Sequence, residues 1–208
     1  MAAYIWDLDG TLLDSYCVII EGAKCAAREF GVPDEPEEIL RVVKQGSLSV
    51  YLKDLAARTG VSADLLMERY RFYSHALDDR IPLIDGAKET LERLAGCGAE
   101  HYVYTHRGDS SGPILERLGI LDCFREVVTA AYGFPSKPSG KGVLYLTEKY
   151  GLDPRQTWYV GDRALDVLCA KDAGVMAVLL LPEGSYVVPT GQEDLIVRSL
   201  REIPSPGT

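Results

Sequence analysis

The stretch YIWDLDGT, residues 4–11, joins a short β-prone run to two acidic side chains and a glycine. In an open parallel sheet, ligands bind just beyond the carboxyl ends of the strands, where these acidic residues fall. Two carboxylates this close repel each other unless a cation lies between them, and a hard dication such as Mg²⁺ prefers oxygen ligands. The stretch therefore predicts a strand that ends at a metal site, although an Asp-Gly turn explains the same residues without a ligand.

Further short runs rich in β-branched or aromatic residues follow, at 102–104, 127–128, 158–160 and 175–181. Near-continuous apolar runs of this length indicate strands covered on both faces, as in a parallel sheet. Apolar residues at helical spacing lie between these runs, around 91–95, 114–118 and 143–150. We also predict a helix start at 153–156, where Asp and Pro precede Gln in a capping pattern. The alternation of strands and helices predicts βαβ units with right-handed crossovers.

The region from 15 to 82 interrupts this alternation. Leucine and tyrosine recur there at helical spacing, and no strand-like run appears. We therefore predict an α/β protein whose core is a Rossmann-like, three-layer parallel sheet formed by residues 1–14 and 83–208. Residues 15–82 would form an all-helical cap domain inserted into that core.

Charge and cysteine content narrow the classes of partner. The 208 residues carry a formal net charge of −9, which argues against broad binding to nucleic acid or to an anionic membrane. Five cysteines without CxxC spacing favour a reducing cytoplasm over a disulfide framework or a zinc site. We see no secretion signal, and the longest apolar run is too short to span a bilayer. We expect a cytoplasmic protein with no nucleic-acid or membrane partner; its oligomeric state is not predicted.

Three more polar segments follow predicted strands. Asp162 comes directly after the fourth strand, and Asp166 lies one helical turn later on the same face. Thr105 follows the second strand and could donate to a phosphate, while Lys137 comes soon after the third and could neutralise phosphate and carboxylates alike. Each has an ordinary alternative: a helix cap, a turn residue or a surface lysine. Their placement after successive strands favours a single site.

In this order, the motifs Asp7-x-Asp9-Gly10-Thr11, Thr105, Lys137 and Gly161-Asp162-x-x-x-Asp166 resemble those of the haloacid dehalogenase superfamily of phosphohydrolases. Residues 12–15 and 85–86 are similar to its phosphoglycolate phosphatase-like branch, which has a helical cap between the first two motifs. The resemblance implies a Mg²⁺-dependent phosphatase that hydrolyses a small phosphorylated metabolite through an aspartyl-phosphate intermediate.

The resemblance also implies the role of each residue. Asp7 would be the nucleophile, and Asp9 would protonate the leaving alcohol and then activate water. An Asp carboxylate has an unperturbed pKa of about 3.9, so it is already ionised at neutral pH and needs no activating base. The phosphoryl oxygens would be held by Thr105, Lys137 and the backbone N–H of Leu8. The Mg²⁺ ligands would be Asp7, the Asp9 carbonyl and Asp162, with Asp166 supporting them directly or through water.

Three places depart from the family pattern, including Ser139-Gly140, where an Asp-Pro continuation is frequent. Trp6 stands where a smaller residue is usual, and His106 stands where Asn is common. His106 is a candidate substrate contact, and a structural hydrogen bond is the alternative.

Two other functions stay open. A phosphoglucomutase-like phosphotransferase of the same branch would pass the phosphoryl group to a sugar hydroxyl instead of water, a choice made by the cap. A non-enzymatic binding protein on the same fold would be expected to have lost the chemical residues, all of which are present.

Overall fold

The computed structural model describes residues 2–206, which form two compact units. One unit comprises the residues up to Asp14 and those from Pro82 onward, and the other is Ser15–Ile81. The sequence interpretation ended the helical segment at Pro82, one residue beyond its end in the structure. Pro82 belongs with the α/β unit, where its carbonyl oxygen accepts the N–H of Asp14 at 3.0 Å.

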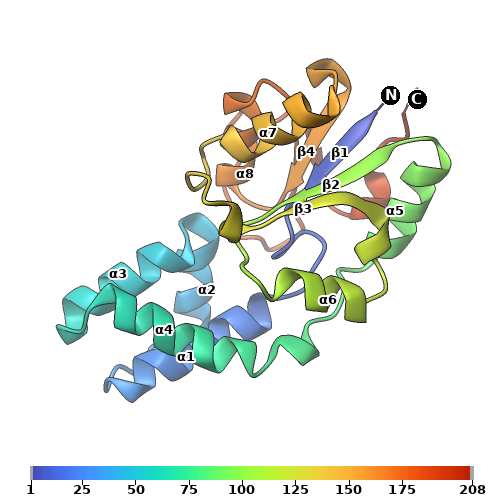
Figure 1. The fold of residues 1–208 in the computed structure, drawn as a ribbon. Helices are drawn as coiled ribbons and strands as arrows, with labels where there is room; N and C mark the ends of the chain where they lie inside the picture. The colour runs from blue at the N-terminus through green and yellow to red at the C-terminus, as the bar shows by residue number, and fades with distance from the viewer. Residues whose placement is uncertain (1, 207–208) are drawn as a thin grey trace. The chain divides into compact units, whose positions relative to one another are not determined.

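The α/β unit contains a six-stranded parallel sheet in the order β3-β2-β1-β4-β5-β6 (Figure 1). The strands are β1 (Ala3–Trp6), β2 (Glu100–Tyr104), β3 (Phe124–Val128), β4 (Thr157–Gly161), β5 (Met176–Leu180) and β6 (Leu195–Val197). One face is covered by α5 (Ala87–Gly96) and α6 (Ser111–Arg117), and the opposite face by α7 (Lys141–Tyr150) and α8 (Ala164–Asp172). This three-layer arrangement confirms the predicted α/β class.

Two local predictions differ from the structure. The short edge strand β6 was not predicted, because three apolar residues give too little pattern to recognise. The predicted helix start at 153–156 is wrong: Pro154–Gln156 form a single 3₁₀ turn, and β4 begins at Thr157. Asp153 does cap that turn, because its side chain accepts the N–H of Arg155 at 2.9 Å. The sequence therefore identified the capping residue correctly, but no α-helix follows it.

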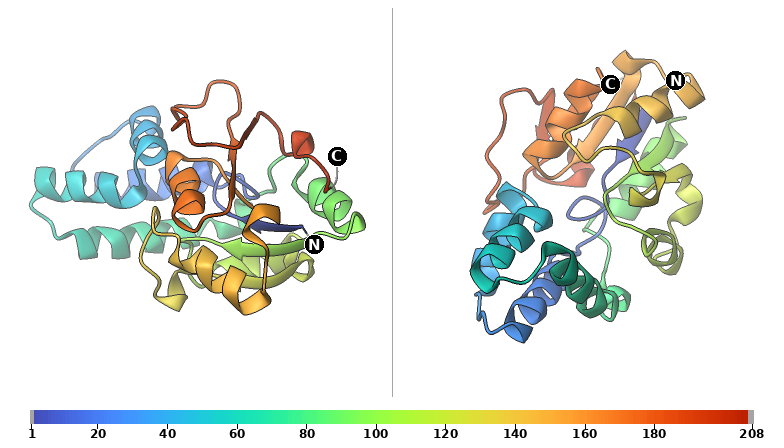
Figure 2. Two further views of the ribbon diagram at one scale, coloured as in Figure 1. Left: turned by 90° about the horizontal axis from the view of Figure 1, so that it is seen from above. Right: turned by 60° about the vertical axis from the view of Figure 1, so that its left-hand side comes forward.

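The second unit consists of α1 (Tyr16–Glu29), α2 (Pro36–Gln45), α3 (Leu48–Thr59) and α4 (Ala63–His75), followed by the 3₁₀ turn Asp78–Arg80. It has its own apolar core, whose members include Ile39, Leu55 and Leu66. Two serines, Ser47 and Ser62, accept the N–H of the third residue of α3 and α4 and so cap these helices. Figure 2 shows the same elements from two further directions. Within residues 2–206, no helix is both long and apolar enough to cross a membrane.

The register of the sheet aligns the carboxyl ends of its central strands. Trp6 of β1 pairs with Val103 of β2 on one side and with Val160 of β4 on the other. The next residue, Asp7, continues the ladder, because its N–H donates to the Val160 carbonyl oxygen at 2.9 Å. Side chains that follow β1, β2 and β4 therefore emerge at one edge of the sheet, as ligand sites do in open parallel sheets.

The unusual Trp6 has a hydrogen-bond partner inside the core. Its indole N–H donates to Nδ1 of His101 at 3.1 Å, and both side chains are buried. A ring nitrogen that accepts carries no proton, so Nε2 of His101 carries it and faces the Leu91 carbonyl oxygen at 3.0 Å. Burial lowers the pKa of His101 to about 4. The large indole is thus tolerated because a neutral histidine satisfies its polar group.

This arrangement predicts a loss of stability on acidification. The unfolded chain takes up a proton on His101 with a pKa near 6.5, whereas the folded chain does so only near 4. The stability that this difference supplies is present above pH 6.5 and is lost as the pH falls toward 4; between pH 7 and pH 5 it amounts to about 2 kcal/mol. We expect His101→Gln to remove this part of the pH dependence, measured by urea unfolding at both pH values. His75→Gln, at an exposed position of α4, is the control. An unchanged pH dependence in His101→Gln would contradict the assignment.

Candidate active site

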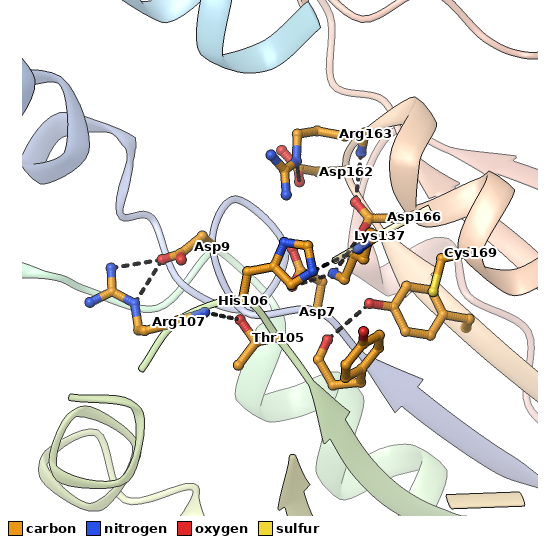
Figure 3. A network of polar contacts seen from close by, with 12 residues as sticks. Asp7, Asp9, Thr105, His106, Arg107, Lys137, Asp162, Arg163, Asp166 and Cys169 are labelled. Carbon is orange, nitrogen blue, oxygen red and sulfur yellow. Dashed lines mark hydrogen bonds and ion pairs between the residues drawn. The ribbon is translucent and has the colours of Figure 1, made fainter. Parts of the chain in front are cut away.

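The polar residues singled out in the sequence gather at the carboxyl edge of the sheet (Figure 3). Asp7 follows β1, Thr105 follows β2, and Asp162 follows β4. Asp166 lies in the first turn of α8, and Lys137 comes from the segment between β3 and α7. All five side chains are buried. The sheet topology therefore brings together residues that are up to 159 positions apart, from 7 to 166 in the sequence.

Lys137 is the centre of the cluster. Its Nζ donates to Oδ1 of Asp7 at 2.8 Å and to Oδ1 of Asp166 at 2.7 Å, and its side chain is 0% exposed. The ammonium group also lies over two aromatic rings, 5.5 Å from the centroid of Tyr104 and 5.2 Å from that of Tyr159. Burial alone would lower the pKa of Lys137, but the two carboxylates outweigh it and raise the pKa. Lys137 is thus held as a cation, although it has no contact with solvent.

The two aromatic rings beside Lys137 are held in place by hydrogen bonds to the backbone. The Tyr159 hydroxyl donates to the Tyr104 carbonyl oxygen at 2.9 Å, and the Tyr104 hydroxyl donates to the Pro135 carbonyl oxygen at 3.2 Å. A Cβ atom at Gly142 would lie 2.3 Å from the Tyr104 ring, so only glycine leaves room for it. The two tyrosines were not recognised from the sequence, because a tyrosine in a strand is usually part of the core.

Asp7 is the residue of the cluster that is best placed to react. Its Oδ1 accepts from Lys137, but its Oδ2 is buried and has no hydrogen-bond partner among the described residues. Burial raises the pKa of Asp7, and the Lys137 ammonium works in the opposite direction. A buried carboxylate oxygen without a partner is costly. Such an oxygen is available to a cation or to a phosphorus atom.

Asp166 has both of its oxygens engaged. Oδ1 accepts from Lys137, and Oδ2 accepts the backbone N–H of Arg163 at 3.0 Å, which also caps α8. Burial would raise the pKa of Asp166, but the charges of Lys137 and Arg163 outweigh it and lower the pKa. The carboxyl group packs so closely on β4 that a Cβ at Gly161 would lie 2.2 Å from the Asp166 Cβ.

A divalent cation fits the acidic cluster. Asp7, Asp162 and Asp166 each offer one carboxylate oxygen, and these atoms lie within 4.8 Å of one another. Carboxylate oxygens are the ligands that hard cations prefer, and Asp7 Oδ2 supplies one without a competing hydrogen bond. Because Lys137 and Arg163 occupy both oxygens of Asp166, this residue is better placed to support the site than to ligate the ion directly.

Asp9 has a different partner from the rest of the acidic residues. Its Oδ1 accepts from Arg107 Nη2 at 2.8 Å and from Arg107 Nε at 3.0 Å. The two side chains face each other on one side of the Lys137 cluster (Figure 3). Sequence reasoning missed Arg107 as a functional candidate; the available signal was its position two residues after Thr105.

His106 makes the structural hydrogen bond that was kept as an alternative. Its Nε2 accepts the backbone N–H of Lys137 at 2.8 Å. Partial burial, together with the positive charges of Lys137 and Arg163, lowers the pKa of His106 to about 4. The ring is therefore neutral at pH 7, as an accepting nitrogen requires. Its part in substrate binding stays a prediction.

The backbone around Leu8 and Thr105 is tightly folded. Leu8 is buried, and its carbonyl oxygen accepts three backbone N–H groups, those of Thr11, Leu12 and Leu13. Gly10 has a positive φ of 79°, which explains the glycine after Asp9. Thr105 Oγ1 accepts the backbone N–H of Arg107 at 3.1 Å. The phosphate-binding roles of Leu8 and Thr105 stay predictions.

The close packing at Gly161 can be tested directly. We expect Gly161→Ala to displace Asp166 and with it one of the two carboxylates that hold Lys137, so that catalytic turnover falls at least about 10-fold. Gly96→Ala is the matched control, because a Cβ there meets nothing within 4 Å and should leave turnover unchanged. Steady-state kinetics on a chromogenic phosphate ester, with circular dichroism to verify folding, would measure this. Full activity in a folded Gly161→Ala variant would show that the Asp166 position is not needed.

Comparison with known proteins gives a consistent picture. Residues 4–180 match the model of the haloacid dehalogenase-like hydrolase family. A phosphoglycolate phosphatase of Chromobacterium violaceum is 30% identical, over 97% of this chain and 94% of the relative. One from Haemophilus influenzae is 31% identical, over 88% of this chain and 87% of the relative.

Solved structures agree with this. A protein of Haemophilus somnus described as a predicted phosphoglycolate phosphatase superposes with a TM-score of 0.81 at 25% identity, covering 98% of this chain and 96% of the other. A haloacid dehalogenase-like family protein of Streptococcus pneumoniae reaches 0.80 over the same shares at 21% identity, which supports the fold alone.

Proposed function

This chain belongs to the haloacid dehalogenase-like hydrolase family, and we propose that it is a Mg²⁺-dependent phosphatase that hydrolyses a small phosphorylated metabolite through an aspartyl-phosphate on Asp7. The family and the phosphoglycolate phosphatase relatives support a phosphoric monoester hydrolase. The observation that carries the mechanism is the state of Asp7, a buried carboxylate with one oxygen fixed by Lys137 and the other without a hydrogen-bond partner among the described residues.

In the first step, one oxygen of Asp7 attacks phosphorus and the bond to the alcohol oxygen breaks. The leaving oxygen takes a proton from Asp9, so that an alcohol departs. In the second step, Asp9 accepts a proton from water as the water oxygen attacks phosphorus, which releases phosphate and restores Asp7. Lys137 and Thr105 would contact the phosphoryl oxygens, together with the backbone N–H of Leu8.

Charge stabilisation is the main task in phosphoryl transfer. Lys137 supplies one fixed positive charge, and Asp7 and Asp162 would hold the metal ion, with the Asp9 carbonyl as a further proposed ligand and Asp166 in support. When bound, Mg²⁺ neutralises negative charge on the transferring phosphoryl group. The helical unit Ser15–Ile81 is proposed as the cap that excludes water during transfer. The five cysteines are free thiols, which suits the proposed cytoplasmic location.

The nucleophile can be tested by a single substitution. Asp7→Asn replaces the carboxylate by a neutral amide of nearly the same size, so we expect turnover to fall by more than about 1,000-fold with the fold retained. Asp122→Asn, at an exposed position of the α/β unit, is the control and should keep full activity. In Asp9→Asn, intact-protein mass spectrometry after reaction with a phosphate ester that has a good leaving group should detect phosphate on Asp7. Appreciable activity in pure Asp7→Asn would refute the assignment.

Metal binding should be visible as a gain in stability. The folded site gathers Asp7, Asp162 and Asp166, whereas the unfolded chain disperses them. Mg²⁺ at a hundredfold excess over its dissociation constant should therefore stabilise the fold by about 2.7 kcal/mol. Asp162→Ala removes a proposed ligand together with some repulsion, so we expect it to be at least as stable as the parent in chelator and to gain little from Mg²⁺.

Thermal melts with chelator and with excess Mg²⁺ measure this for both proteins, without any assay of activity. An equal gain in the parent and in Asp162→Ala would mean that Asp162 is not an important ligand.

A further inference from the structure

The ammonium group of Lys137 has more donors than the carboxylates beside it use. Such a group carries three N–H donors. Two of them are directed at Oδ1 of Asp7 and Oδ1 of Asp166, at 2.8 and 2.7 Å (Figure 3). No other oxygen of residues 2–206 accepts from Nζ, and the Lys137 side chain is 0% exposed. The two carboxylates therefore hold the charge and use only two of its donors.

Two aromatic ring faces lie beside the same ammonium group. Nζ is 5.2 Å from the ring centroid of Tyr159 and 5.5 Å from that of Tyr104, and both tyrosines are buried. These distances fall within the range of about 6 Å over which the negative face of a ring attracts a cation. The hydroxyl groups point elsewhere, because Tyr159 donates to the Tyr104 carbonyl oxygen and Tyr104 to that of Pro135. The rings therefore act on the ammonium group through their faces.

The fold gives both rings a fixed place. They come from β2 and β4, on either side of β1, and meet nearly edge to face with their centroids 6.4 Å apart. The backbone of Lys137 is anchored at the same end of β2, since its N–H donates to Nε2 of His106 at 2.8 Å. Both the backbone and the ammonium group of Lys137 are thus placed by residues at the end of β2, with Tyr159 of β4 completing the arrangement.

A ring face has two advantages over a third carboxylate at this position. A third carboxylate would accept the remaining N–H, and its negative charge would repel an incoming phosphate group. A ring face attracts the cation through its quadrupole, so it adds no net charge and uses no donor. The ammonium group is stabilised in the interior, yet one N–H remains for a phosphoryl oxygen.

We propose that Tyr104 and Tyr159 are positioning residues whose ring faces hold the Lys137 ammonium group for phosphoryl transfer while leaving it one N–H for a phosphoryl oxygen. The proposal rests on the phosphatase function proposed above and adds two residues to the set on which turnover depends. Core packing is the ordinary role of two buried tyrosines. It depends on the volume of the rings, whereas the proposed role depends on the negative charge of their faces, so the two roles can be separated by experiment.

Ring fluorination weakens the face of an aromatic ring while nearly preserving its volume, because fluorine withdraws electron density. Tyr159→Phe is the reference, since it removes the hydroxyl and its hydrogen bond but keeps the ring. Phenylalanines with one, two and three ring fluorines are then placed at position 159 by nonsense suppression. With excess Mg²⁺ and a chromogenic phosphate ester, kcat should fall with each added fluorine, by about 10-fold in total relative to Tyr159→Phe. The same series at Tyr104, with Tyr104→Phe as its reference, should show the same order.

Thermal melts in chelator give a second readout that needs no activity. A weaker ring face compensates the buried ammonium group less well, so Tm should fall in the same order as kcat. Phe124, at the amino end of β3 and away from the carboxyl edge that carries the site, is the matched control. Trifluorophenylalanine at that position should leave kcat and Tm at their parent values. Circular dichroism verifies that each variant folds.

The outcomes distinguish the positioning role from the proposed function. If the parent is active and kcat is the same throughout the fluorinated series, the ring faces do not position Lys137, and the phosphatase stands. The same holds if Tyr159→Phe already shows the whole loss of kcat, since the hydroxyl would then be responsible. A folded parent that hydrolyses no chromogenic phosphate ester with Mg²⁺ overturns the proposed function and this inference with it.

Discussion

A buried ammonium group allows three carboxylates to lie together at the edge of the sheet. Removing a charge from water is costly unless partners compensate for it, and Lys137 compensates Asp7 and Asp166 at 2.8 and 2.7 Å. Asp162 has the Arg163 guanidinium near it, 3.9 Å away. Three negative charges thus face two positive ones, so the cluster keeps a net charge of −1. A dication would turn this into +1, which is the sign that an incoming phosphoryl group requires.

The order of strands and helices explains which parts of the site could be predicted from the sequence. Parallel strands place the residues that follow them at one edge of the sheet. The predicted site residues all follow a strand or begin the helix after it: Asp7, Thr105, Lys137, Asp162 and Asp166. That rule needs only the order of the elements, so a single sequence suffices to apply it.

The residues that surround the cluster follow no such rule. Tyr104 and Tyr159 lie under Lys137 only because β2 and β4, on either side of β1, bring their rings together. Arg107 meets Asp9 across 98 positions of sequence. The need for glycine at 142 and 161 arises from side chains that pack against them from elsewhere in the fold. Contacts of this kind leave no local pattern. Asp153 shows the reverse case, in which a local capping pattern is present but the strand that follows prevents a helix.

The degree of burial assigns different tasks to the two groups of charges. The Lys137 ion pairs are wholly buried, and separating them would leave a bare charge in a medium that cannot solvate it, so this cluster is a permanent feature of the fold. The pair of Asp9 with Arg107 is open to water on the Asp9 side, where a departing carboxylate can be hydrated at once. Neither side chain of this pair is wholly buried, so separating the pair costs less than separating the Lys137 ion pairs. Permanence suits the role proposed for Lys137, which is to hold the phosphoryl oxygens that every phosphate ester has. A pair that can separate suits the role proposed for Asp9, which would have to turn from Arg107 to exchange a proton with the leaving alcohol.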